Sequence, residues 1–258
     1  MSIRNTHHNL PCMAGIAVLF AIPSTIEAAV IDVTRDAVDQ IRGRSQDTDA
    51  RPLGYFTSST ETTVGSTGGT GQRHDNNIVY RYLLPTLNPG ETIESFSFTF
   101  QITAHRDHSG DKYELDVYLL DEADPTTTGT DLFFHGANDT DHALVGSRFI
   151  DAGSDNGSIT LSPPVSVTFN INSGSALDLL QSFYGGDHIP DQTWASFRFN
   201  LDQLYVNSES NPLGGNGLNR YIIDNDVSTS SFEITAIPEP ATALLGGLGF
   251  LMLLRRRR

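Results

Sequence analysis

Residues 91–104 read ETIESFSFTFQITA and decide the fold of this chain. After Ile93, the apolar residues Phe96, Phe98, Phe100 and Ile102 fall on alternate positions, with serine, threonine and glutamine between them. Successive side chains of a strand point to opposite faces of the sheet. The alternation therefore predicts a long β-strand with one face in the core.

Similar alternation recurs outward from this stretch. It predicts strands over residues 78–84, 113–120, 165–171, 194–201, 220–223 and 231–237. Turn signals such as Asn88-Pro89-Gly90 and Asp155-Asn156-Gly157 separate these runs. Many short alternating strands joined by Gly/Asn/Asp loops predict an all-β fold, an antiparallel β-sandwich of jelly-roll-like type.

Three segments depart from the strand pattern. Residues 32–41 place apolar side chains at helical spacing and predict a short helix. A second helix is expected to begin at Ser175, whose hydroxyl can cap it, and to end at Gly185-Gly186. The Thr/Ser/Gly-rich residues 58–71 predict a surface loop.

The charge of the chain is strongly acidic. Of its 16 basic and 31 acidic residues, 11 and 30 lie within residues 29–240, which gives this body a net charge of −19. Such a surface repels phosphate backbones, so the sequence predicts no nucleic-acid partner. The single cysteine, Cys12, lies outside the body, which therefore has neither a disulfide nor a thiol nucleophile.

The N-terminal residues predict a secretory signal peptide over residues 1–28. Arg4 provides a weakly cationic start, and residues 13–22, MAGIAVLFAI, form an apolar stretch of signal-peptide length. Pro23 ends this stretch, and small residues at Ala28 and Ala29 provide a cleavage context. We expect export through the Sec machinery and cleavage by signal peptidase, which leaves an extracellular β-sandwich domain over residues 29–235.

The C-terminal residues 236–258 predict a membrane-directed segment. Residues 241–254, ATALLGGLGFLMLL, are apolar and uncharged, and Arg255, Arg256, Arg257 and Arg258 close the chain. As a helix these fourteen residues reach about 21 Å, less than the roughly 30 Å hydrocarbon core, so we expect a single hydrophobic helix that is a poor permanent anchor. The arginines favour the cytoplasmic side, which places the body outside.

The tail resembles a PEP-CTERM sorting domain of Gram-negative bacteria. The resemblance rests on Pro238-Glu239-Pro240, the apolar stretch and the arginine block, and it covers residues 237–258. It implies that exosortase, a membrane transpeptidase-like enzyme, recognises and removes the tail. It also implies a transient inner-membrane intermediate and a final place on the cell surface or in the extracellular matrix, in association with exopolysaccharide and biofilm.

The body shows no motif that identifies an enzyme. His105 to Asp111 and His135 to His142 each gather histidines and aspartates, which could bind a divalent metal or form a solvated loop, and we favour the loop. Asp and Asn oxygens could bind a structural Ca²⁺, but no EF-hand spacing is present, so we predict no cofactor. Trp194, Tyr184 and Tyr205 could stack on sugar rings, although alternating aromatics more often belong to a core.

Two functions therefore remain open for the body. The first is a non-catalytic β-sandwich that interacts with exopolysaccharide or other surface components. The second is a secreted, carbohydrate-active hydrolase with carboxylates in a cleft, because paired carboxylates meet only in the fold and cannot be recognised from spacing.

Overall fold

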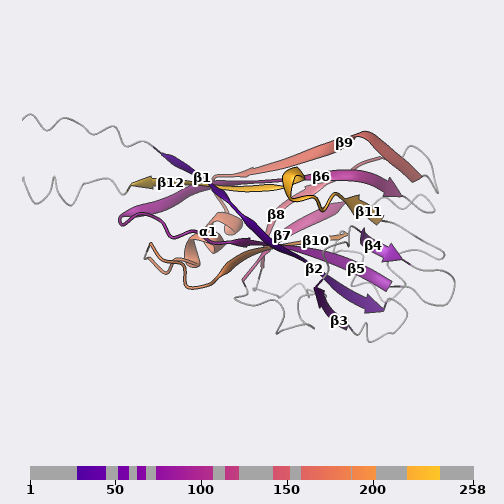
Figure 1. Cartoon of the computed structure of the whole chain (residues 1–258), viewed down its shortest axis with the longest axis horizontal. Helices are drawn as coiled ribbons and strands as arrows, with labels where there is room; N and C mark the ends of the chain where they lie inside the picture. The colour runs from indigo at the N-terminus through magenta and orange to yellow at the C-terminus, as the bar shows by residue number, and fades with distance from the viewer. Residues whose placement is uncertain are drawn as a thin grey trace, which may run out of the picture.

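The structure, a computed structural model, describes residues 28–44, 52–57, 63–67, 74–106, 114–121, 142–151, 158–186, 188–201 and 220–238. Within these ranges the chain forms strands, one α-helix and a short 3₁₀ helix, and each strand pairing there is antiparallel (Figure 1). The predicted all-β class is confirmed.

The elements follow one another along the chain as a run of strands with one helical interruption. The strands are β1 (Ala29–Val33), β2 (Arg35–Arg44), β3 (Pro52–Thr57), β4 (Thr63–Thr67), β5 (His74–Leu83), β6 (Glu91–Arg106), β7 (Leu115–Leu120), β8 (His142–Arg148), β9 (Ser158–Ile171), β10 (Trp194–Leu201), β11 (Arg220–Ile223) and β12 (Ser231–Pro238). Helix α1 (Ser175–Ser182) follows β9, and the 3₁₀ helix η1 (Val227–Thr229) lies between β11 and β12.

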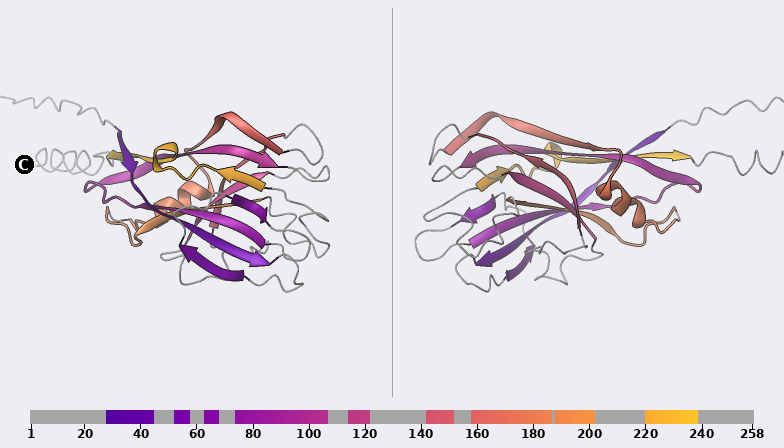
Figure 2. Two further views of the ribbon diagram at one scale, coloured as in Figure 1. Left: turned by 45° about the vertical axis from the view of Figure 1, so that its right-hand side comes forward. Right: turned by 180° about the vertical axis from the view of Figure 1, so that it is seen from behind.

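The strands lie in two layers that are connected by two short strands. One layer contains β1, β12, β6 and β9, and the other contains β3, β2, β5, β10, β7 and β8. Strand β11 pairs with β6 and with β4, and β4 pairs with β5, so β4 and β11 connect the layers. Figure 2 shows the two layers from two further sides.

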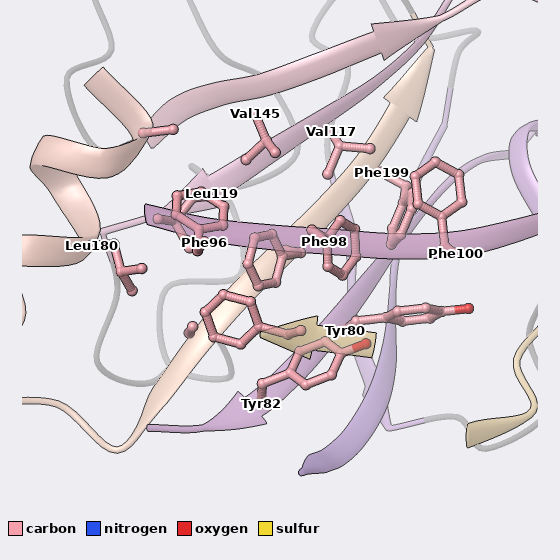
Figure 3. Close-up of a cluster of buried hydrophobic side chains, with 14 of the residues drawn as sticks. Tyr80, Tyr82, Phe96, Phe98, Phe100, Val117, Leu119, Val145, Leu180 and Phe199 are labelled. Carbon is pink, nitrogen blue, oxygen red and sulfur yellow. The ribbon is translucent and has the colours of Figure 1, made fainter. Parts of the chain in front are cut away.

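Aromatic side chains fill the space between the layers (Figure 3). Phe98 of β6 stacks on Phe197 of β10 with ring centroids 4.2 Å apart and an interplanar angle of 6°. Tyr82 of β5 packs edge-on against Phe98 and against Phe232 of β12. Each such ring pair contributes about 0.5–1.5 kcal/mol beyond the burial of its area. The alternating phenylalanines of residues 91–104 thus form the centre of the core, as predicted.

A buried arginine ties β2 to the connection between β11 and β12. Arg35 donates from Nη1 to Ser230 Oγ at 2.7 Å and from Nη2 to the carbonyl of Asn225. Its guanidinium lies 4.6 Å from the ring centroid of Tyr80, and Tyr82 donates its hydroxyl to the same Ser230 Oγ at 3.0 Å. The charge is therefore solvated by fixed protein groups, which a buried cation requires.

The predicted helix over residues 32–41 is wrong, because these residues belong to β1 and β2. Val33 and Arg35 are both buried, so a charged side chain occupies a core-facing position. A bulge between Arg35 and Ala37 then shifts the alternation by one residue. The shift brings Val38, opposite the buried Tyr80, to the core-facing side, five positions after Val33, so the apolar residues no longer alternate strictly.

Three further strands were not predicted. Strand β4 lies within residues 58–71, where a loop was expected, and it carries only Val64 as a large apolar side chain. Strands β3 and β8 were also missed. In β8 the alternation is weak, because Leu144 is exposed beside the buried Ala143 and Val145.

The helix expected at Ser175 is confirmed as α1, but Ser175 is its first helical residue and Gly174 is the N-cap. Gly174 has no side chain and therefore supplies no capping oxygen. Gly185 and Gly186 follow the helix with φ of 54° and 87°, the left-handed region that ends helices at glycine.

Candidate functional site

The two ends of the described body lie side by side. Strand β1 pairs antiparallel with β12, with Ala29 opposite Ala236. The beginning of β1 and the end of β12 therefore leave the sandwich at the same end (Figure 1). We call this end the terminal pole: Ala29 and Val30 of β1, residues 236–238 of β12, and residues 91–93 of β6, which pair with them.

The last three residues of β12 form a distinct short ladder with β6. A bulge between Thr235 and Ala236 interrupts the register. Beyond it Ala236 pairs with Ile93, Ile237 with Thr92, and Pro238 with Glu91. Pro238 has no N–H and donates no ladder hydrogen bond, so the final pair is the weaker end of this ladder.

Of the predicted sorting residues, Pro238 alone lies within the described ranges, as the half-buried last residue of β12. Glu239, Pro240 and Arg255, Arg256, Arg257 and Arg258 lie outside the described residues, as do residues 1–27 and 241–254. Strand β12 thus continues three residues beyond the body boundary at 235 that the sequence suggested. No helix in the described part of the chain is both long and apolar enough to cross a membrane.

A pocket of about 500 Å³ opens beside the terminal pole. It lies between the start of β6, the segment that precedes it, and the end of α1 with the turn that follows. Its described lining is mixed, with apolar, hydroxyl, amide, imidazole and carboxylate groups: Leu87, Gly90, Glu91, Thr92, Ile93, Gln181, Tyr184, Gly186 and His188.

Hydrogen bonds hold the polar lining of this pocket in place. The carboxylate of Glu91 accepts from the backbone N–H and the side-chain amide of Asn88, both at 2.8 Å. Gln181 Nε2 donates to the carbonyl of Ile93 at 2.8 Å. The Tyr184 hydroxyl donates to the carbonyl of Pro85 at 2.9 Å, and burial raises the pKa of Tyr184, so this phenol stays protonated. Such fixed donors and acceptors suit a ligand rich in hydroxyl groups.

The two histidine clusters do not come together as a metal site in the described residues. His105 is 2% exposed, lies within β6, and stacks on Tyr221 with ring centroids 4.1 Å apart, so the loop expected there is wrong for this residue. His142 begins β8 and packs edge-on against Tyr118 at 5.0 Å. Asp107 to Asp111 and His135 to Asp141 lie outside the described residues. Within the described ranges, no three His, Cys, Asp or Glu residues are placed to hold a metal ion.

The aromatic residues proposed for sugar stacking occupy different places. Tyr184 is buried beside the pocket, with 4% of its surface exposed. Trp194 is half-buried at the start of β10, where it donates to Asp36 Oδ2 at 2.9 Å and carries Arg81 at 4.8 Å from its ring centroid. Arg81 therefore covers one face of the Trp194 ring. Tyr205 lies outside the described residues.

The face of β10 that points away from the core is polar and buried. Arg198 is 0% exposed, and its guanidinium lies 5.0 Å from the ring centroid of Tyr118 on β7. The neighbouring Asp116 accepts from Ser147 Oγ at 2.6 Å. Tyr118 and Ser147 thus contact Arg198 and Asp116 inside the protein, and we assign these groups a structural role.

The chain matches no family model and no curated protein sequence. The pocket residues Glu91, Gln181 and His188 were not recognised in the sequence. Glu91 precedes the other two by at least 90 positions and meets them only through the packing of α1 against the start of β6.

Proposed function

We propose that this protein is an exported, non-catalytic domain of the bacterial surface or extracellular matrix that is processed at both ends. Its jelly-roll-like sandwich lies between a signal peptide, residues 1–28, and an exosortase-recognised sorting segment within residues 236–258. The observation that supports this proposal is where the fold begins and ends. The described strands run from Ala29 to Pro238, so cleavage after Ala28 and removal of the tail beyond Pro238 cut through no described strand.

The shared terminal pole fits the transient membrane intermediate of this proposal. The two predicted membrane-directed segments are joined to β1 and β12, whose free ends leave the sandwich at the same end. A single membrane can therefore hold both segments at once without distortion of the sheet. The rest of the body then points away from that membrane, toward the exterior.

The pocket supports an interaction with polysaccharide. Its lining combines a carboxylate, an amide, a hydroxyl and an imidazole with the apolar side chains of Leu87 and Ile93. The body carries a net charge of −19, which disfavours acidic ligands. We therefore propose a neutral exopolysaccharide as the ligand class.

The alternative, a carbohydrate-active hydrolase, receives less support. Both retaining and inverting glycosidases use two carboxyl groups that face the scissile bond. Glu91 is the one carboxylate among the described residues that line the pocket, and Asn88 already donates two hydrogen bonds to it.

Binding of neutral matrix polysaccharide by the secreted protein tests this proposal. Protein collected from the medium should bind polysaccharide prepared from the matrix of the producing strain, and Glu91→Gln should weaken binding at least about tenfold, as loss of a hydrogen bond to a charged group predicts. Glu94→Gln is the matched control, because Glu94 is an exposed residue of the same strand outside the pocket lining. Equal binding by the Glu91→Gln variant and the parent would mean that the pocket does not bind the polysaccharide.

A further inference from the structure

We propose that the tail is removed only when the last three residues of β12 leave the sheet, so that the pairing of β12 controls its own processing. The inference rests on the proposed function, in which an enzyme at the membrane surface acts on the segment that follows β12. For this enzyme to act, the folded body must expose that segment as free chain.

Very little chain separates the folded body from the predicted apolar segment. Only Glu239 and Pro240 separate the end of β12 from the predicted apolar segment, residues 241–254. Two extended residues span about 7 Å. The headgroup layer on each side of a bilayer is roughly 5–8 Å thick. With β12 fully paired, the body would therefore rest against the headgroups and leave no length of free chain for an enzyme to surround.

Release of residues 236–238 from the sheet would supply the missing length of free chain. Together with Glu239 and Pro240 they provide five extended residues, which span about 17 Å. The body can then stand clear of the headgroups while the segment around Pro238 lies in the extended form that a protease-like active site binds.

The pairing of β12 is weak at its last three residues. The bulge between Thr235 and Ala236 already interrupts the ladder there. Beyond it, β1 contributes a single partner, Ala29 opposite Ala236, and Pro238 donates no hydrogen bond. Ala236 is buried, but its one methyl group makes its exposure inexpensive.

The opening should stop at the bulge. Ile234 and Phe232, which precede it on β12, are 0% exposed in the core. Phe232 packs edge-on against Tyr82 and Phe197, with ring centroids 5.5 Å and 5.0 Å away. Residues 232–235 also pair with both β1 and β6, whereas Ser231 pairs with β6 alone. Their release would open the aromatic core, which is far more costly than the release of three terminal residues.

A cross-strand disulfide tests whether the end of β12 must open. Thr92 and Ile237 are directly opposite each other and lie on the outward face, so the Thr92→Cys/Ile237→Cys variant can form a disulfide in an oxidising periplasm. The body has no native cysteine that could compete. The matched control is Ser97→Cys/Glu233→Cys, an outward-facing pair of the same two strands before the bulge. Each full-length variant is expressed in a host with an active exosortase, and disulfide formation is scored by thiol labelling.

The expected result is that disulfide-linked Thr92→Cys/Ile237→Cys molecules keep the tail and accumulate in the inner membrane. Molecules of the same culture with free thiols, the parent and the linked Ser97→Cys/Glu233→Cys control should all lose the tail. Tail removal from the linked Thr92→Cys/Ile237→Cys protein at the rate of the parent would overturn the inference and leave the proposed function intact. Retention of the tail by the linked control would also overturn it, because the block would not be specific to the last three residues. A parent that keeps its tail would instead refute the proposed function, and with it this inference.

Discussion

The ring of Phe169 in β9 packs directly against the Cα side of Gly146 in β8. A Cβ atom at position 146 would lie under 3.0 Å from two carbons of that ring, a distance that real Cβ atoms essentially never show. Strand β8 is the last strand of one layer, and β9 is the last strand of the other on the same side. The contact therefore joins the two layers at the edge formed by β8 and β9, and it requires glycine for space.

Gly146→Ala should accordingly destabilise the domain by about 1–3 kcal/mol, the usual cost of overpacking. Urea denaturation of the purified protein measures this change. The control is the Gly146→Ala/Phe169→Ala double variant compared with Phe169→Ala alone. Without the ring atoms that clash with the new methyl group, Gly146→Ala should cost less stability in this background. If Gly146→Ala were as stable as the parent, the close approach of β8 and β9 would be contradicted.

Alkaline pH should weaken the fold through its buried tyrosines. Burial raises the pKa of Tyr82 from 10.0 to about 12. Below pH 10 the phenol is neutral in both states, and its contribution to stability is fully present. As the pH rises from 10 to 12, the unfolded chain loses this proton first, so the free energy of unfolding falls, by about 2–3 kcal/mol at most for this group.

Urea denaturation at a series of pH values from 8 to 12 tests this expectation. Tyr82→Phe should show a shallower loss of stability above pH 10, because it removes one titrating phenol. Some loss should persist, since burial also raises the pKa of Tyr80 and of Tyr184. Identical slopes for Tyr82→Phe and the parent would mean that Tyr82 ionises equally in the folded and unfolded states.

The alternation of residues 91–104 was sufficient to predict the central strand and its core face, because the core-facing positions there are all apolar. The same holds for residues 194–201 and 220–223, whose predicted ranges coincide with β10 and β11. The rule fails where a charged residue such as Arg35 faces inward and a bulge shifts the register, as in β2. It fails again in β4, whose serines, threonines and glycine carry almost no apolar signal.

The candidate site was less predictable than the fold. Glu91 lies in a strand that the sequence identified, but nothing in its local pattern distinguishes it from the exposed Glu94 three positions later. Its role depends on Gln181 and His188, which α1 and the turn after it bring to the same pocket. The terminal pole could not be predicted either. It depends on the pairing of Ala29 with Ala236, which lie at opposite ends of the body in the sequence.

The two parts of the predicted sorting segment should fail in different ways. Glu239→Ala should leave export intact and block removal of the tail, so that the precursor accumulates in the inner membrane. Deletion of Arg255 to Arg258 should instead weaken membrane retention and release unprocessed protein, because the arginines no longer oppose transfer through hydrocarbon. Cell fractionation with an antibody to the body distinguishes the two outcomes. If Glu239→Ala protein were processed and located like the parent, Pro238-Glu239-Pro240 would be a linker and not a recognition element.

The intact mass of the protein recovered from the cell surface or medium tests the central claim most directly. We expect a chain that begins at Ala29 or Val30 and has lost the apolar segment and Arg255 to Arg258, with β1 and β12 both retained. N-terminal sequencing and peptide mapping of the same sample assign the two ends. A recovered protein that still carries residues 1–26 or the terminal arginines would contradict export with processing at both ends.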